Sequence, residues 1–537
     1  MTRSEIHRTS APATETVPPP GSGRARTLLS SRAGAVLLPT LLLVVAAFGF
    51  RSIGLTTSFE LWVDEMLYAE LGASVARGEL PNLPDGPFFL HPPGFFIAEA
   101  IAIHLFGISG DRMDLVYQLR WVSAFCGALS VGLIFVILRR PIGAPAAFVA
   151  GLLAVFEPFI LRNNSRVFIE TTGMLAVLVG LALVSEHLSR DHLCREADQR
   201  SRLRLVVAGL ALGYGLLTKD VLFVCTVVPV ALAVLWRRTL PLRDGALLMA
   251  TTVVPYVIYL IVLAFSGGLG GWFEAKSQGL LRALGFVQAT GFNAPNSPSL
   301  IGRVLDQLGS FGTSYVLLLV CPLAGVVAAL SASPARRFLG LVALMMGLFG
   351  VYSAAFGTFE EQYGYPVMIA GILAAAISAV ELAARFPRAR RPITAVCLVF
   401  VVAAAVLGIR AEATTDDGFL QVRDWMRTNL PVGAKVGVTN STGAWAFDQD
   451  PHFGVWASLP DLADNGASYV LTQSLPTSLG YGYAKPELLP WLAANAKPMI
   501  AVNGPTNGTT TLWFIDKDAL QAGAEARVAF PANEREQ

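Results

Sequence analysis

Two adjacent carboxylates, Asp64 and Glu65, follow directly after an apolar segment of the chain. They lie between Trp62 and Tyr68, which are residue types that anchor at membrane interfaces. Asp64 and Tyr68 are four residues apart, so a helix lying on the membrane would place both on one face. Adjacent acids point in different directions on a helix, so one can face a reacting centre while the other braces the fold or a metal. The pair indicates acid–base chemistry at a membrane surface; the alternative is that both acids only mark the interface.

Three further motifs carry side chains that such chemistry needs. His91 is followed by two prolines, which fix the backbone and remove amide donors, although a plain turn would use them equally. Arg166 and Glu170 stand where an apolar segment begins, spaced either for a structural ion pair or for a functional site. Lys219 and Asp220 form a charged corner between two apolar segments. The Lys219 ammonium could meet a phosphate as a point charge or pair with Asp220.

The run 359–366 places two acids, Glu360 and Glu361, and the aromatic Tyr363 immediately before another apolar segment. Charge is otherwise scarce, because the 537 residues are 54% hydrophobic and 15% charged, with a mean hydropathy of +0.56. Soluble domains carry about 25% charged residues, so the deficit indicates a membrane protein. The nearly balanced net charge of +2 excludes a strongly basic nucleic-acid binder.

The histidines and cysteines indicate neither a disulfide framework nor a defined metal site. The six histidines and five cysteines are scattered without a CxxC or HExxH spacing, and no cysteine in the sequence lies beyond residue 410. One cluster, Glu186, His187, Asp191, His192 and Cys194, lacks a recognisable metal-ligand spacing. A solvated loop between helices is the simpler interpretation of that cluster.

Eleven segments have the apolar character of membrane spans, which need about 20 residues each: 33–53, 117–138, 143–161, 168–188, 203–218, 220–236, 246–266, 313–331, 337–356, 365–385 and 392–410. A shorter apolar run, 95–106, decides the topology. If it does not cross, the arginine-rich loops near 139–140, 190–204, 237–243, 336–337 and 385–391 all fall on one side. The positive-inside rule makes that side cytoplasmic.

The opposite, extracytoplasmic face then carries the loops 54–116, 162–167, 218–220, 267–312 and 359–366. Topology alone therefore predicts that one membrane face gathers the candidate side chains Asp64, Glu65, His91, Arg166, Lys219 and Glu361.

Three regions follow from this reading. Residues 1–30 are expected to form a disordered cytoplasmic tail, and 31–410 a mainly α, polytopic domain of about 11–13 spans. Residues 411–537 are expected to form a small extracytoplasmic α/β domain that acts as a lid, an acceptor-docking surface or a simple stabiliser. Within it the patterns predict a helix at 419–430 and strands at 435–439, 469–472, 499–502 and 510–515.

These motifs, in this order, resemble a known family. The sequence Asp64-Glu65-x-x-Tyr68, then His91-Pro92-Pro93, Ser165-Arg166 with Glu170, and Leu217-Thr218-Lys219, is similar to the polyprenyl-phosphate-dependent GT-C glycosyltransferases. The nearest branch is that of the protein O-mannosyltransferases and the lipid A aminoarabinose transferases. The resemblance covers residues 33–410 in order and topology, together with the external C-terminal domain.

The resemblance implies that Asp64 is the general base and that Arg166 and Lys219 hold the phosphate of the donor. Beside Asp64, we expect Glu65 to be a second acid, a brace or a ligand of a divalent cation such as Mg²⁺ or Mn²⁺. We also expect Tyr68, His91 and Tyr363 to bind the phosphate or sugar of the donor, supported by Glu170, Asp220 and Glu361. Two positions depart from the family pattern. Gln362 stands where Arg often precedes the tyrosine, so an expected phosphate-binding cation is missing, and Asp220 stands where Gly often follows the lysine.

The predicted reaction is inverting transfer of a hexosyl or pentosyl group from a polyprenyl-phosphate donor to an acceptor hydroxyl. The acceptor would be a cell-envelope glycan, lipid or protein on the extracytoplasmic side, and direct displacement with one base predicts inversion. The alternatives are a secondary transporter or lipid-linked sugar flippase, and a polytopic scaffold whose tail binds a partner. Transporters tend to repeat their halves and to place polar residues at the bilayer midplane, whereas here the acids gather at one face.

Overall fold

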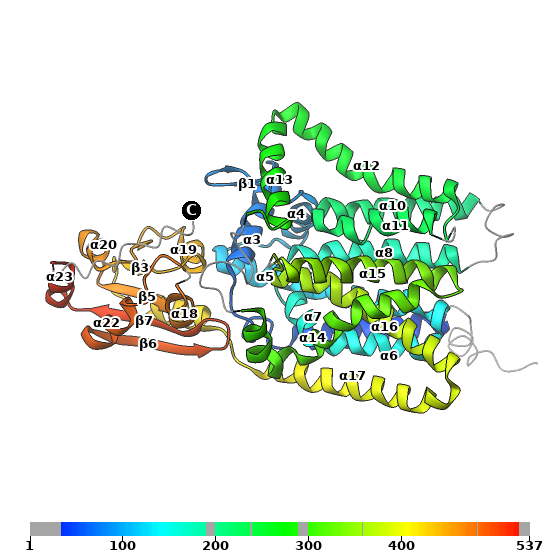
Figure 1. Ribbon diagram of the computed structural model, residues 1–537. Helices are drawn as coiled ribbons and strands as arrows, with labels where there is room; N and C mark the ends of the chain where they lie inside the picture. The colour runs from blue at the N-terminus through cyan, green and yellow to red at the C-terminus, as the bar shows by residue number, and fades with distance from the viewer. Residues whose placement is uncertain are drawn as a thin grey trace, which may run out of the picture.

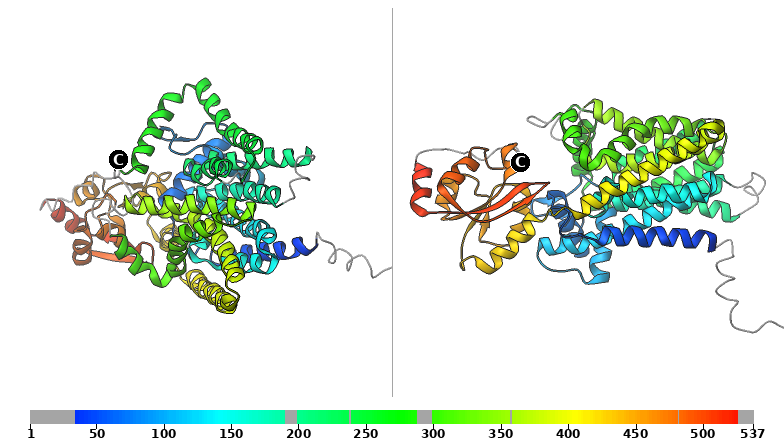
Figure 2. Two further views of the ribbon diagram at one scale, coloured as in Figure 1. Left: turned by 45° about the vertical axis from the view of Figure 1, so that its right-hand side comes forward. Right: turned by 90° about the horizontal axis from the view of Figure 1, so that it is seen from below.

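The computed structural model describes residues 34–189, 199–236, 239–287, 299–356, 358–480 and 482–525. A bundle of long helices carries a mixed α/β domain at one of its ends (Figures 1 and 2). The predicted N-terminal tail, 1–30, lies outside the described residues, as do Asp191, His192 and Cys194 of the histidine–cysteine cluster. The architecture confirms the predicted fold class, a polytopic α-helical membrane protein with a small C-terminal sheet.

Nine helices among the described residues are long and apolar enough to cross a membrane, and each coincides with a predicted span. They are α2 (Gly34–Ser52), α5 (Arg112–Ile142), α8 (Ile169–Leu188), α10 (Gln199–Thr218), α12 (Leu242–Ser266), α14 (Leu300–Ala329), α15 (Pro334–Ala355), α16 (Gly364–Arg385) and α17 (Arg390–Ala413).

The two remaining predicted spans are interrupted. The segment 143–161 becomes α6 (Ala144–Phe156) and α7 (Pro158–Asn164), which bend by 62° where Glu157 precedes Pro158, because proline cannot donate the helical hydrogen bond. The segment 220–236 becomes the 3₁₀ helix η1 (Asp220–Val224) and the short α11 (Val227–Leu235). Within its described residues the structure thus gives nine spans by length, or ten with the bent pair, where the sequence predicts eleven.

The first loop, 54–116, folds into elements that lie at the end of the bundle nearest the C-terminal domain (Figure 1). These are α3 (Val63–Ala76), the two-residue strands β1 (Asn82–Leu83) and β2 (Gly86–Pro87), and α4 (Gly94–Phe106). The run 95–106 is this short helix α4, which at 13 residues falls below the length of a span. Its packing against α3 keeps it at the same end of the bundle.

The prediction that 267–312 is a long loop is wrong. The segment holds α13 (Leu269–Ala283) and the first turns of α14. The error arose because α13 is amphipathic and starts after glycines, so it lacks the unbroken apolar run used to find helices in a membrane chain. Its bulky side chain Phe273 is exposed while Lys276 is mostly buried, so the polar side of α13 faces the protein.

The C-terminal domain is a five-stranded sheet of order β4-β3-β5-β7-β6 covered by short helices. Strand β3 is parallel to β4 and β5, whereas β7 is antiparallel to β5 and β6. The elements are α18 (Gly418–Asn429), β3 (Val436–Val438), α19 (Ser441–Phe447), β4 (Phe453–Gly454), α20 (Leu459–Asp464), β5 (Tyr469–Gln473), α21 (Ser474–Ser478), α22 (Leu488–Asn495), β6 (Ala496–Gly504), β7 (Gly508–Ile515) and α23 (Lys517–Glu525). The predicted helix and all four predicted strands are present, and the two-residue β4 was too short to detect.

The domain and the first loop share one buried hydrophobic cluster. Met66 and Leu71 of α3 belong to the same cluster as Phe419 and Val422 of α18, and all four side chains are almost fully buried. The domain is therefore packed onto α3 and not merely joined to the bundle by a linker. Such apolar burial stabilises by about 25 cal/mol per Å².

The basic ends of the helices meet at the opposite end of the bundle. Arg336 at the start of α15 donates to the Pro141 carbonyl at the end of α5 (2.8 Å) and pairs with Glu381 near the end of α16 (2.8 Å). Arg140 pairs with Glu186 near the end of α8 (3.3 Å). The arginines at these helix ends and the Asp64 region therefore occupy opposite ends of the bundle. The short η3 (Pro387–Ala389) joins α16 to α17 at the basic end.

Candidate active site at the junction of bundle and C-terminal domain

The helix that carries the acid pair, α3, is capped at its N-terminus by one of its own acids. Trp62 is the N-cap of α3, and the Glu65 side chain reaches back to accept the Trp62 amide (3.2 Å). Two acids in the first turn also favour the positive end of the helix dipole. Because α3 runs unbroken from Val63 to Ala76, Asp64 and Tyr68 share one face, as their spacing predicts.

Glu65 is a brace. Its carboxylate is fully buried and forms a bidentate pair with the Arg120 guanidinium, accepting hydrogen bonds from Nε (2.9 Å) and Nη2 (2.8 Å). The Val167 amide adds a third hydrogen bond at 2.9 Å. With both oxygens occupied, Glu65 does not fit the roles of catalytic acid or metal ligand, which were the other readings of the sequence. No group of three or more His, Cys, Asp or Glu in the described parts of the chain is arranged to hold a metal ion.

Asp64 has the opposite environment. Its side chain is half-buried, and it forms no hydrogen bond or ion pair within the described part of the chain. Burial, with further contributions from Glu360 and Glu170, raises the pKa of Asp64 to about 6, against the lowering effect of Lys219. A carboxylate whose lone pairs are free and whose pKa lies just below neutrality suits a general base.

Lys219 lies at the corner between α10 and η1 and pairs with Glu170, not with its neighbour Asp220. Its ammonium also lies 5.3 Å from the centre of the Tyr363 ring. The expected local pair of Arg166 and Glu170 is absent, because α7 ends at Asn164 and α8 begins at Ile169. The i, i+4 contact requires a continuous helix, and the break separates the two side chains.

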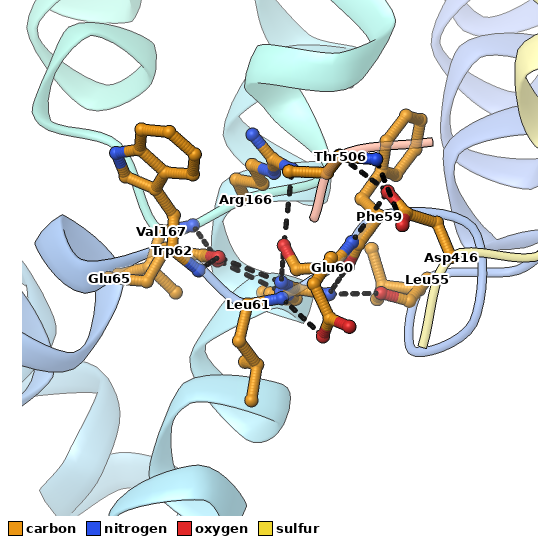
Figure 3. A network of polar contacts seen from close by, with 11 residues as sticks. Leu55, Phe59, Glu60, Leu61, Trp62, Glu65, Arg166, Val167, Asp416 and Thr506 are labelled. Atoms are coloured by element: carbon orange, nitrogen blue, oxygen red, sulfur yellow. Dashed lines mark hydrogen bonds and ion pairs between the residues drawn. The ribbon is translucent and has the colours of Figure 1, made fainter. Parts of the chain in front are cut away.

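Arg166 is turned into the protein. It is 1% exposed, donates to the Glu60 carbonyl (3.1 Å) and lies 5.9 Å from the Trp62 ring. This position fits a structural role at the start of α3 better than the predicted contact with a donor phosphate. The network around it is shown in Figure 3.

Tyr68 and His91 face one another. The Tyr68 hydroxyl lies 3.4 Å from His91 Nε2, and the rings meet edge to face at 5.9 Å. Burial lowers the pKa of His91 well below its usual value, and Lys219, Lys276 and Arg282 add to the effect. His91 is therefore neutral near pH 7 and can offer a hydrogen bond but no positive charge.

Two cations on α13 complete the site, and neither was identified from sequence. Lys276 pairs with Asp220 (2.5 Å) and donates to the Leu90 carbonyl (2.7 Å), directly before His91. Arg282 acts electrostatically on both His91 and Tyr363, and its guanidinium has no hydrogen-bond or ion-pair partner among the described residues. The available signal was that basic residues, Lys276 and Arg282 among them, stand in a loop assigned to the non-cytoplasmic face, against the positive-inside rule.

The motif 359–366 is partly occupied by its own contacts. Gln362, which stands where a cation was expected, donates to the Glu360 side chain (2.6 Å). Glu361 pairs with Arg162 of α7 (3.0 Å) and remains half exposed. Tyr363 closes η2 (Glu361–Tyr363) and lies beneath Lys219. Arg282, near Tyr363, supplies positive charge where the motif itself lacks it.

Comparison with known proteins connects this geometry to one group. Residues 112–273 match the sequence profile of the family described as dolichyl-phosphate-mannose-protein mannosyltransferase. No curated protein matches the sequence.

Solved structures match over nearly the whole chain. ArnT from Cupriavidus metallidurans bound to undecaprenyl phosphate is 17% identical, with a TM-score of 0.51, over 90% of this chain and 98% of that one. The archaeal oligosaccharyltransferase AglB from Archaeoglobus fulgidus, in complex with an inhibitory peptide and a dolichol-phosphate, is 12% identical. Its TM-score is 0.53, over 92% of this chain and 77% of that one.

At these identities the structural likeness shows the fold, and the matched segment contains Arg120, Arg166, Glu170 and Lys219. The chain is therefore a multi-pass membrane protein of the GT-C fold that resembles the polyprenyl-phosphate-dependent glycosyltransferases, as its motifs predicted.

Proposed function

We propose that this protein transfers one sugar from a polyprenyl-phosphate donor to a hydroxyl group of an envelope glycan, lipid or protein. The observation that carries the proposal is Asp64. It is a half-buried carboxylate without a hydrogen bond among the described residues, its pKa is raised to about 6, and it feels the charge of Lys219, while the α13 cations act on His91. Phosphate-binding neighbours of the same fold, one with undecaprenyl phosphate and one with a dolichol-phosphate, support a lipid-phosphate donor.

The step is a direct displacement. Asp64 takes the proton of the acceptor hydroxyl while that oxygen forms a bond to the anomeric carbon, and the bond from that carbon to the phosphate oxygen breaks. The electron pair leaves with the polyprenyl phosphate, whose charge Arg282 and Lys219 stabilise in a site with little water. One displacement inverts the anomeric configuration. The site lies at the end of the bundle away from the arginine-rich helix ends, and the positive-inside rule supports an extracytoplasmic location for it.

Incubation of the purified protein in lipid nanodiscs with undecaprenyl-phosphate [¹⁴C]mannose and envelope extract tests the proposal against its rival. We expect release of undecaprenyl phosphate and appearance of the label in an acceptor. A flippase would instead move the intact donor across proteoliposome membranes without cleaving it. Intact donor after exposure to a panel of undecaprenyl-phosphate sugars and acceptors would contradict the proposal.

The pH dependence of transfer follows from the raised pKa of Asp64. The base is active only when ionised, so kcat/KM is expected to increase with pH up to about 6 and then level off. The measurement is an initial-rate profile between acidic and neutral pH in which protein stability is checked at each point. A profile whose acid limb persists unchanged in the residual activity of Asp64→Asn would assign that limb to another group.

Arg282→Gln is expected to raise the KM for the donor by about 10–100-fold, because a charge-assisted hydrogen bond to phosphate is worth about 1.5–3 kcal/mol. The matched control is Arg77→Gln, an arginine of the first loop whose side chain is 53% exposed and pairs with surface acids. Donor titration of both variants provides the comparison. An unchanged KM in Arg282→Gln would remove this residue from the donor site.

A further inference from the structure

The short segment that leads into α3 is held from three directions (Figure 3). Arg120 of α5 donates to the carbonyls of Leu55 (3.0 Å) and Phe59 (2.8 Å). Arg166, between α7 and α8, donates to the carbonyl of Glu60 (3.1 Å). The third direction is the C-terminal domain, which reaches the same segment through polar contacts separated by more than 350 positions in the sequence.

Glu60 forms direct hydrogen bonds with the C-terminal domain. One of its carboxyl oxygens accepts the amide of Phe419 in the first turn of α18 (3.1 Å), and the other accepts its neighbour Leu61 (2.9 Å). Its own amide donates to Asp416 (3.3 Å). Glu60 is 1% exposed and Asp416 2% exposed, so these contacts are sealed from water.

Asp416 extends the connection into the sheet. Its carboxylate accepts the hydroxyl of Thr506 (2.6 Å) and the amide of the same residue (3.3 Å), in the turn between β6 and β7. Its amide donates to the Thr57 carbonyl (2.7 Å). The tip of a hairpin and the start of α18 therefore act together on the chain only a few residues before Asp64.

The same segment is continuous with the catalytic helix through the buried Arg120. That guanidinium binds the carbonyls before Glu60 on one side and the Glu65 carboxylate on the other. Glu65 in turn fixes the first turn of α3, which carries Asp64. A shift of Glu60 must move Arg120 or the start of α3, because interiors are close-packed and neighbouring groups cannot yield independently.

We propose that Glu60 is a positioning residue for Asp64, and that the C-terminal domain is a working part of the active site that sets the orientation of the base through Asp416 and Glu60. Only the expected effect of Glu60 on turnover rests on the proposed function. The mechanical part, ordering of the start of α3 by the domain, can be measured without any substrate.

A second set of contacts between the domain and the bundle provides the control. Arg423 of α18 pairs with Asp114 at the start of α5 (2.8 Å), and Arg112 pairs with Asp448 next to α19 (2.8 Å). These ion pairs also hold the domain in place but do not touch the segment 55–62. Removing one of them loosens attachment without acting on the backbone that leads into α3.

The experiment compares Glu60→Ala, Glu60→Gln, Thr506→Val and Asp114→Ala in the full-length protein in nanodiscs. Burial, with a smaller contribution from Asp416, raises the pKa of Glu60 to about 8, and glutamine is neutral and of the same size but keeps only one acceptor oxygen. Hydrogen–deuterium exchange of the amides at 61–68 is measured first, followed by kcat, KM for the donor and the pH–rate profile.

Glu60→Ala is expected to increase exchange at 61–68 by about tenfold. It should lower kcat by about 10–100-fold with KM unchanged, because misplacement of a catalytic group by about 1 Å costs up to about 10²-fold. Glu60→Gln should recover part of the loss, because its one amide oxygen can still accept one of the two backbone amides, and Thr506→Val should show the same pattern as Glu60→Ala more weakly. Asp114→Ala should leave exchange at 61–68 and kcat near wild type.

Two results would overturn the proposal. One is wild-type exchange at 61–68 in Glu60→Ala; the other is an equal loss of kcat and thermal stability in Glu60→Ala and Asp114→Ala. If the wild-type protein cleaves no polyprenyl-phosphate sugar, the proposed function fails, while the exchange measurement still decides the coupling.

Discussion

Asp64→Asn is expected to lower the rate of sugar transfer by about 10²–10⁴-fold, the usual contribution of a general base. Asparagine keeps the size of the side chain and its place in the first turn of α3, but it cannot accept the proton of the acceptor hydroxyl. The variant should fold normally, because the Asp64 carboxylate forms no hydrogen bond within the described part of the chain. Steady-state transfer from the labelled donor in nanodiscs provides the measurement.

Asp85→Asn is the matched control for this change. Asp85 lies in the same loop, between β1 and β2, and its side chain is exposed. The same chemical change there should leave transfer within about twofold of wild type, as surface substitutions away from a site rarely matter. Near-normal transfer by Asp64→Asn would show that the base lies elsewhere.

Breaking the buried pair of Arg120 and Glu65 is expected to have the largest effect on stability. Both side chains are 0% exposed, so Arg120→Met leaves the Glu65 carboxylate buried without its partner. Loss of one member of a buried pair costs about 3–5 kcal/mol in the free energy of unfolding. Reversible unfolding in mixed micelles should register this loss together with loss of transfer.

Two further variants show whether the loss in Arg120→Met comes from the unpaired buried carboxylate. The double variant Arg120→Met with Glu65→Leu removes the unpaired charge and should regain part of the lost stability, but not all of it, because the carbonyls of Leu55 and Phe59 and the amide of Val167 also lose their partners. Arg77→Met breaks an exposed pair with Glu70 and should cost less than about 1 kcal/mol. A small loss in Arg120→Met would mean that Glu65 is not held as the structure indicates.

The sequence predicted nine of the eleven spans as the described residues show them, the end of the bundle where the acids gather and the four longer strands of the C-terminal domain, because these depend on local apolar patterns and loop charge. Arg120 escaped notice although it lies inside a predicted span, where an ionisable residue is a functional candidate by default. Lys276 and Arg282 were hidden by an amphipathic helix that was read as a loop. The charge of each of these residues was a usable signal, but a pattern of apolar residues does not register it.

The partnerships between residues were harder to predict. Lys219 pairs with Glu170 across two helices, so neither neighbour in sequence supplies its counter-charge. Glu60 and Asp416 are 356 positions apart, and only the packing of the C-terminal domain onto α3 brings them together. Sequence spacing carries information about contacts within one helix or strand, whereas contacts of this kind depend on the tertiary fold.

The most direct test of the account separates binding of the donor from transfer in Asp64→Asn. Donor affinity is measured by displacement of labelled undecaprenyl phosphate, and the chemical step by single turnover with saturating undecaprenyl-phosphate sugar. The account predicts an affinity within about threefold of wild type and a single-turnover rate at least about 10²-fold lower. A single-turnover rate close to wild type would contradict the assignment of Asp64 as the base, and so would a loss of donor binding that accounts for the whole defect.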